Sequence, residues 1–309
     1  MKICCKCWPI SLKKGKFNLK HINLRIYEGQ GFIRNSALYA LANFKQHGLL
    51  NRGVQQQEMT EYKKGKFYAG TSNVVLPVPN KQSFPQEFQD KSRLCYYGSL
   101  FNSVEVNSTF YKLPLAKTVA KWASEVPDNF KFTFKLWQEI THLKGQQFDP
   151  EHVARFMNII NQAGDKKGCL LVQFPPSVVF SPVLLGNLLN EINSENADYA
   201  WQVAVEFRHK SWYQDVTYQM LDQHLATMVL HDLPASAAPI QTGEADAVYL
   251  RFHGPNGGYR GSYDDDFLYE YAQFVKEWME DGKTVYAYFN NTMGEAVQNL
   301  MTFNRYVSS

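Results

Sequence analysis

Residues 169–207 contain a complete strand–helix–strand unit, made of CLLVQF (169–174), SPVLLGNLLNEI (181–192) and WQVAVEF (201–207). The first and last segments are apolar runs of strand length. In the middle segment apolar residues recur at three- and four-residue spacing, and Ser181 followed by Pro182 is typical of a helix start. Two strands joined by such a helix predict a parallel βαβ unit.

The same alternation of strand-like and helix-like segments continues in both directions from this unit. Eight strand-like runs occur, at residues 67–72, 103–107, 130–136, 169–174, 201–207, 227–232, 247–254 and 284–291. Eight units within about 250 residues predict an α/β fold, a (β/α)8 TIM-type barrel that spans residues 59–309. An open doubly wound sheet is the alternative, but the first turn, Gly70–Asn73, lacks its glycine-rich fingerprint.

Charge is unevenly distributed along the 309 residues. Residues 1–66 contain 13 Lys and Arg but only 3 acidic residues, whereas residues 67–309 contain 19 basic and 26 acidic residues. We therefore predict that residues 1–58 form a poorly structured basic extension outside the barrel. An acidic body makes nucleic acid an unfavourable partner. A membrane-spanning segment is not expected, because no apolar run reaches about 18 residues.

The five cysteines suggest neither a disulfide framework nor a zinc site. Cys4, Cys5 and Cys7 lack a second pair at finger spacing, and Cys95 and Cys169 are isolated. The protein is therefore expected in a reducing compartment, the cytoplasm, without a metal or another cofactor.

Polar residues occupy the carboxyl ends of most predicted strands, often two residues apart and hence on one face. These residues are Glu105 and Asn107, Thr133 and Lys135, Gln173, Glu206 and Arg208, His231 and Asp232, Arg251 and His253, and Asn290 and Asn291. Because the active sites of TIM barrels form at this end, the pattern predicts a site there. The alternative is a purely structural ion-pair network of three carboxylates and three cations that closes the barrel top.

Several ordered motifs resemble one known family. They are Gly70–Ser72, FNSVEVNSTFYKLP (101–114), ITH (140–142), VQFPPS (172–177), VEFRHKSW (205–212), YLRFHG (249–254), YRGSY (259–263) and YFNN (288–291). The chain resembles the YecE-like family, domain of unknown function 72, from about Phe67 to Phe303. The resemblance implies a TIM-type barrel and no established reaction.

The loops near the predicted site favour a small anionic ligand. Arg260 lies in the glycine-rich turn 254–261, and such turns present backbone N–H groups to anions. With Arg208 and Arg251 it predicts recognition of a phosphate or carboxylate group. Trp212 and Tyr259 are candidate stacking residues.

The main functional hypothesis is an enzyme acting on this anion by acid/base chemistry. Glu206 or Glu105 is the predicted general acid/base, Lys135 and His253 assist proton transfer, and the remaining candidates bind substrate: Asn107, Gln173, Arg208, Trp212, Asp232, Arg251, Tyr259, Arg260, Asn290 and Asn291. One alternative is a divalent-metal phosphoesterase or nuclease with Glu105, Glu206, Asp232, His231 and His253 as ligands. Another is a non-catalytic ligand-binding barrel.

Overall fold

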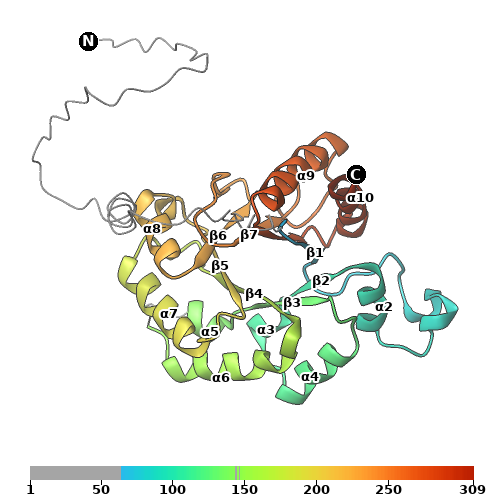
Figure 1. The fold of residues 1–309 in the computed structure, drawn as a ribbon, viewed down its shortest axis with the longest axis horizontal. Helices are drawn as coiled ribbons and strands as arrows, with labels where there is room; N and C mark the ends of the chain where they lie inside the picture. The colour runs from blue at the N-terminus through green and yellow to red at the C-terminus, as the bar shows by residue number, and fades with distance from the viewer. Residues whose placement is uncertain (1–63, 143–144, 146) are drawn as a thin grey trace, which may run out of the picture. The chain divides into compact units, whose positions relative to one another are not determined.

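The computed structural model describes residues 64–309 except 143, 144 and 146, so the predicted extension, residues 1–58, lies outside the described part. These residues form eight parallel strands: β1 (Phe67–Thr71), β2 (Ser103–Val106), β3 (Lys131–Lys135), β4 (Lys167–Gln173), β5 (Gln202–Glu206), β6 (Ala226–His231), β7 (Ala247–Phe252) and β8 (Thr284–Phe289). They pair in the order β1-β8-β7-β6-β5-β4-β3-β2 (Figure 1). The predicted TIM-type barrel is confirmed.

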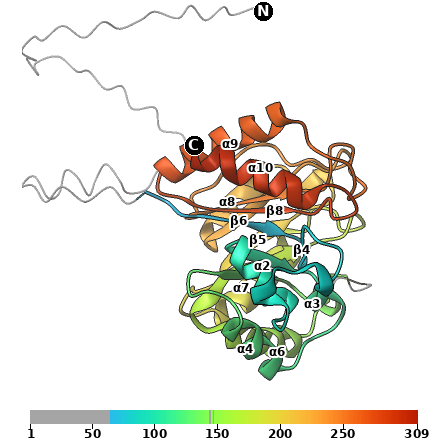
Figure 2. The same cartoon turned by 90° about the vertical axis from the view of Figure 1, so that its right-hand side faces the viewer.

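Helices follow most of the strands and cover the outer surface of the sheet. They are α2 (Arg93–Leu100), α3 (Ser108–Tyr111), α4 (Ala116–Ser124), α5 (Gln138–Thr141), α6 (Pro150–Ile160), α7 (Pro182–Glu195), α8 (Asp215–Gln223), α9 (Asp265–Glu280) and α10 (Ala296–Ser308). Figure 2 shows α9 and α10 on one side of the strands and α4 and α6 on the other. Between β6 and β7 the described residues 232–246 form a loop without a helix, and Pro234 and Pro239 disfavour one there.

The strands separate two apolar cores because successive side chains face opposite sides. The larger core lies between the strands and the helices. The smaller one fills the barrel interior and consists of Cys169, Leu171, Ala204, Val229, Ala247, Tyr249, Tyr286 and Tyr288. On each of these strands, the inward-facing residue that follows this core therefore points into the mouth of the barrel at its carboxyl end.

The barrel closes between β1 and β2 through side chains more than through backbone pairing. The described residues show one backbone bridge there, between Ser72 and Glu105. The Asn102 amide accepts from the backbone N–H of Ala69 at 2.9 Å, and the Tyr97 hydroxyl accepts from that of Thr71 at 2.7 Å. These bonds satisfy backbone groups that a regular ladder would otherwise pair.

None of the helices among the described residues is long and apolar enough to cross a bilayer. Cys95 and Cys169 are both free thiols.

Candidate active site at the carboxyl ends of the strands

Glu105 lies at the centre of a buried polar network at the barrel mouth. Its carboxylate accepts hydrogen bonds from Arg251, at 2.9 Å from Nη2 and 3.0 Å from Nε, and from Ser72 and Tyr249, at 2.5 Å each. Burial alone would raise the pKa of Glu105, but the charge of Arg251 and these hydrogen bonds outweigh it and leave the pKa below its usual range. Glu105 is therefore an ionised anchor for Arg251.

Glu206 extends this network to β5. Its Oε2 accepts from Arg251 Nη1 at 2.8 Å, and its Oε1 accepts from Arg208 Nε. The side chain has no exposed surface. Burial opposes ionisation, but the charges of Arg208 and Arg251 prevail and hold the pKa of Glu206 well below its usual range. A carboxylate so placed neither holds a proton near neutral pH nor faces a ligand.

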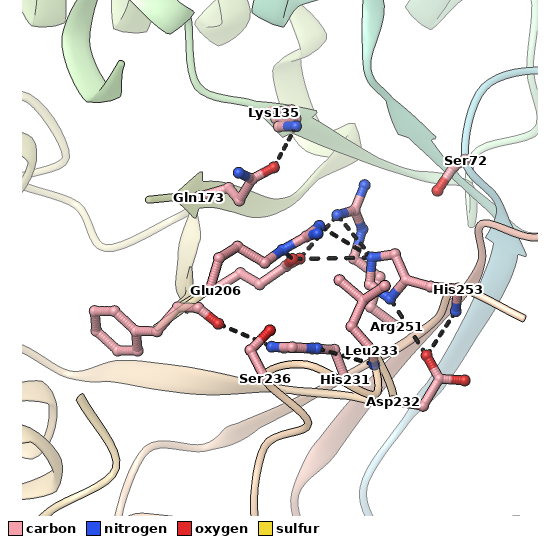
Figure 3. A network of polar contacts seen from close by, with 12 residues as sticks. Ser72, Lys135, Gln173, Glu206, His231, Asp232, Leu233, Ser236, Arg251 and His253 are labelled. Atoms are coloured by element: carbon pink, nitrogen blue, oxygen red, sulfur yellow. Dashed lines mark hydrogen bonds and ion pairs between the residues drawn. The ribbon is translucent and has the colours of Figure 1, made fainter. Parts of the chain in front are cut away.

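His253 lies between Arg251 and Asp232 (Figure 3) and also contacts Arg208. Its Nε2 is 3.2 Å from both Arg208 Nη2 and Arg251 Nη1, and its Nδ1 is 3.3 Å from Asp232 Oδ1. Because guanidinium nitrogens only donate, we assign the imidazole proton to Nδ1, facing Asp232. Burial lowers the pKa of His253 to about 4, so the ring is neutral.

These contacts do not favour the predicted acid/base roles of Glu105, Glu206 and His253. Glu105 accepts from several donors, Glu206 is fully buried and paired with two arginines, and the free lone pair of His253 faces the same two arginines. The alternative reading, a structural ion-pair network, accounts for these three side chains better.

A small pocket of about 270 Å³ opens above this network. It is lined by Asn73, Asn107, Tyr111, Lys135, Gln173, Arg208, Arg251, Tyr259, Asn290, Thr292 and Met293. Among the described residues, this lining includes three cationic side chains and no carboxylate. The pocket is thus suited to a small anion, with the neutralising glutamates held behind it.

Lys135 is the lining residue with the most unusual environment. Its Nζ donates to Gln173 Oε1 at 2.6 Å and lies 4.1 Å from the centre of the Phe110 ring. Within the described chain it forms no ion pair. Burial and the nearby charge of Arg251 lower the pKa of Lys135 to about 7.

Comparison with known proteins assigns the chain to a family. The family model described as "Protein of unknown function DUF72" matches residues 68–309. The chain belongs to the DUF72 family. It is 25% identical over 253 residues to UPF0759 protein YunF of Bacillus subtilis, covering 68% of this chain and 84% of YunF.

Solved DUF72 structures have the same fold. A DUF72 protein from Thermotoga maritima matches with a TM-score of 0.65 and 26% identity, covering 79% of this chain and 100% of that one. A DUF72 protein from Enterococcus faecalis matches with a TM-score of 0.65 and 21% identity, covering 80% and 99%. None of these descriptions states a reaction or a ligand.

Most of the predicted binding residues of this DUF72 chain converge on the pocket, but four do not line it. Trp212 is fully buried, stacks on Phe207 with ring centres 4.4 Å apart and donates to the Val178 carbonyl. Asn291 donates to Gly261 and Asn299. Asp232 lies behind His253, and the Arg260 side chain is exposed outside the pocket. Trp212 and Asn291 therefore serve packing and loop structure.

Other contributors were not among the candidates predicted from sequence. Tyr249 lies two residues before Arg251, so the same-face rule applied one step further back identifies it. Ser72 and Asn73 follow β1, whose carboxyl end was not predicted to contribute site residues. Thr292 and Met293 lie in the loop after β8 and carry no signal that distinguishes them from other loop residues.

The metal alternative receives little support from the side chains. The described residues contain no group of three or more His, Cys, Asp or Glu side chains that could hold a metal ion. Two proposed ligands, Glu105 and Glu206, are held by arginines, and His231 Nε2 instead lies 2.9 Å from the Phe207 carbonyl.

Proposed function

We propose that this DUF72 protein is an enzyme that binds a small phosphate- or carboxylate-bearing molecule at the barrel mouth and transfers a proton through Lys135. One observation carries the proposal: Lys135 lines a pocket together with Arg208 and Arg251, and no described carboxylate pairs with it. The reducing, cytoplasmic setting stays a prediction from the sequence.

Arg208 is the best-placed group for the anion. The N–H groups of Arg251 already donate to Glu105, Glu206, His253 and Asn107. Among the described residues, Arg208 makes hydrogen bonds only from Nε, to Glu206, and from Nη2, to His253. Since a guanidinium has five N–H groups, Arg208 retains donors that a phosphate or carboxylate can accept.

Lys135 is the best-placed group for proton transfer. A general base works best when its pKa lies close to the working pH, and burial together with the charge of Arg251 brings the pKa of Lys135 to about 7. Its amine is held by Gln173 at the pocket wall. An anion bound by Arg208 therefore lies in the same small cavity as a base that is partly deprotonated at neutral pH.

Calorimetric titration of the full chain with inorganic phosphate and with pyruvate tests the anion site. Arg208→Gln should weaken binding roughly ten- to a hundredfold, because it removes charged hydrogen bonds. Arg260→Gln is the matched control, since that arginine lies outside the pocket, and should bind as the wild type does. Equal affinities in all three proteins, or no binding to the wild type, would overturn the proposal.

Exchange of the pyruvate methyl protons in D₂O, followed by NMR, tests the proton transfer. The wild type should accelerate exchange, Lys135→Met should lose the acceleration, and Lys112→Met should keep it because Lys112 is an exposed lysine. Binding without any Lys135-dependent exchange would contradict an enzymatic role and favour the non-catalytic binding barrel.

A further inference from the structure

The amine of Lys135 is built into the pocket wall instead of reaching into solvent. Lys135 ends β3, and Figure 3 shows its amine beside Gln173, apart from the contacts between Glu206, Arg251 and His253. Only 9% of the residue is exposed. The hydrogen bond to Gln173 and the Phe110 ring fix the position of Nζ.

The surroundings of this amine favour its neutral form. A buried lysine is normally held charged by a carboxylate, but Glu105 and Glu206 are engaged by Arg251 and Arg208. Burial, and then the charge of Arg251, lower the pKa of Lys135 to about 7. A lysine that is desolvated beside a fixed cation is the arrangement in which the amine is nucleophilic near neutral pH.

The pocket also limits the size of a partner for this amine. At about 270 Å³ it lies just below the usual range of ligand-site volumes, so it suits a molecule of a few carbon atoms. The free donors of Arg208 would hold one anionic end of such a molecule. The other end then lies close to Lys135.

We propose that the substrate is a small anion that carries a carbonyl group, and that Lys135 forms an imine with that carbonyl. This inference rests on the proposed function, because it uses the same pocket and the same anion site; Lys135 then promotes the proton transfer through the imine instead of abstracting the proton as a free amine. The observation that supports it is that one small cavity contains an amine that no carboxylate of the described residues pairs with, and an arginine that keeps free donors among the same residues.

The step balances without any further reactant. The lone pair of Nζ attacks the carbonyl carbon, so a C–N bond forms and the oxygen takes a proton. Both amine protons leave with that oxygen as one water molecule, which yields the C=N bond. The imine nitrogen, once protonated, withdraws electrons and makes loss of a proton or a bond cleavage at the adjacent carbon easier.

Trapping with sodium borohydride tests the inference, because hydride reduces the imine to a stable secondary amine. The full chain is incubated with pyruvate in one arm and dihydroxyacetone phosphate in the other, which distinguishes carboxylate from phosphate substrates. Intact mass and peptide mapping then locate the adduct. Lys135→Met and Lys135→Arg remove the nucleophile, the second while keeping a cation, and Lys112→Met is the matched control.

We expect one adduct per chain, on Lys135, in the wild type and in Lys112→Met, and its loss from both Lys135 variants. The arm that reacts identifies the anionic group. Adducts scattered over surface lysines, or persisting in Lys135→Met, would overturn the inference. Phosphate and pyruvate binding that depends on Arg208, with no adduct in either arm, would overturn the imine while leaving the proposed function intact. If the wild type binds neither phosphate nor pyruvate, both the imine and the proposed function are overturned.

Discussion

Glu105 and Arg251 form a buried two-point ion pair although 146 residues separate them in the chain. Arg251 Nη2 lies 2.9 Å from Oε1 of Glu105, and Arg251 Nε lies 3.0 Å from Oε2. The pair connects β2 to β7 across the mouth of the barrel. It thereby sets the position of Arg251, from which the contacts to Glu206 and His253 follow.

Replacing Glu105 by Gln should destabilise the protein strongly. The change leaves the guanidinium of Arg251 buried with only one carboxylate, and breaking a buried pair costs about 3–5 kcal/mol. Urea unfolding measures the loss. Lys121→Met, which breaks the exposed pair with Glu125, is the control and should cost less than about 1 kcal/mol. Equal losses in both variants would show that the buried pair has no special role.

Lys135 should make the stability of the wild type depend on alkaline pH. Burial and the charge of Arg251 lower its pKa from 10.5 to about 7, so between these values the unfolded chain binds more protons than the folded one. The free energy of unfolding is therefore highest above pH 10.5, where Lys135 is neutral in both states. It decreases as the pH falls toward 7, because only the unfolded chain then gains the proton. At about 1.4 kcal/mol per pKa unit, the change amounts to a few kcal/mol.

Urea unfolding at pH 7 and pH 10 checks this dependence. Lys135→Met should be at least as stable as the wild type at pH 7 and should lack the gain that the wild type shows at pH 10. Lys112→Met should follow the wild type at both values. A wild type whose stability does not rise relative to Lys135→Met would refute the neutral buried amine.

His253 should contribute to acid destabilisation in a different window. Burial lowers its pKa from 6.5 to about 4, so the unfolded chain binds the extra proton first as the pH falls. The stability due to neutral His253 is present above pH 6.5 and is lost as the pH falls toward 4, by about 3 kcal/mol. His253→Asn should show a shallower loss over this range in denaturant titrations. Parallel curves for the two proteins would disprove the assignment.

Gly70 should tolerate no side chain, because β1 and β2 approach each other closely there. A Cβ at Gly70 would lie 2.0 Å from the Ser103 carbonyl oxygen, so Gly70→Ala must separate the two strands. We expect a loss of several kcal/mol, about as large as a severe core substitution. Gly186→Ala in α7 is the matched control, since its Cβ would meet Met220 at 3.5 Å, and should stabilise by roughly 0.5–1 kcal/mol. Thermal unfolding of both variants separates the two outcomes.

The strand pattern was readable from sequence because each strand is a local feature. The run at 247–254 predicted β7, Ala247–Phe252, and the run at 201–207 predicted β5, Gln202–Glu206. The spacing of two between Arg251 and His253, and between Thr133 and Lys135, correctly placed each pair on one face. These inferences need only backbone periodicity, which a single strand or helix expresses by itself.

The roles of the polar residues were decided by the closed barrel. Three carboxylates and three cations were predicted at the strand ends, but the sequence did not indicate which of them pair. Partners such as Glu105 and Arg251 meet only when β2 and β7 face each other. Trp212, a candidate for ligand stacking, instead donates to the Val178 carbonyl and stacks on Phe207.

The eight strands, the end of the barrel where polar groups gather and the family were all predictable from the order of residues alone. The pairing of Glu105 and Glu206 with arginines, which leaves Lys135 without a carboxylate among the described residues, depends instead on the folded barrel. This is because burial and nearby charged partners set the pKa of a side chain and hence whether it is ionised. Both are supplied by residues that lie far apart in the chain.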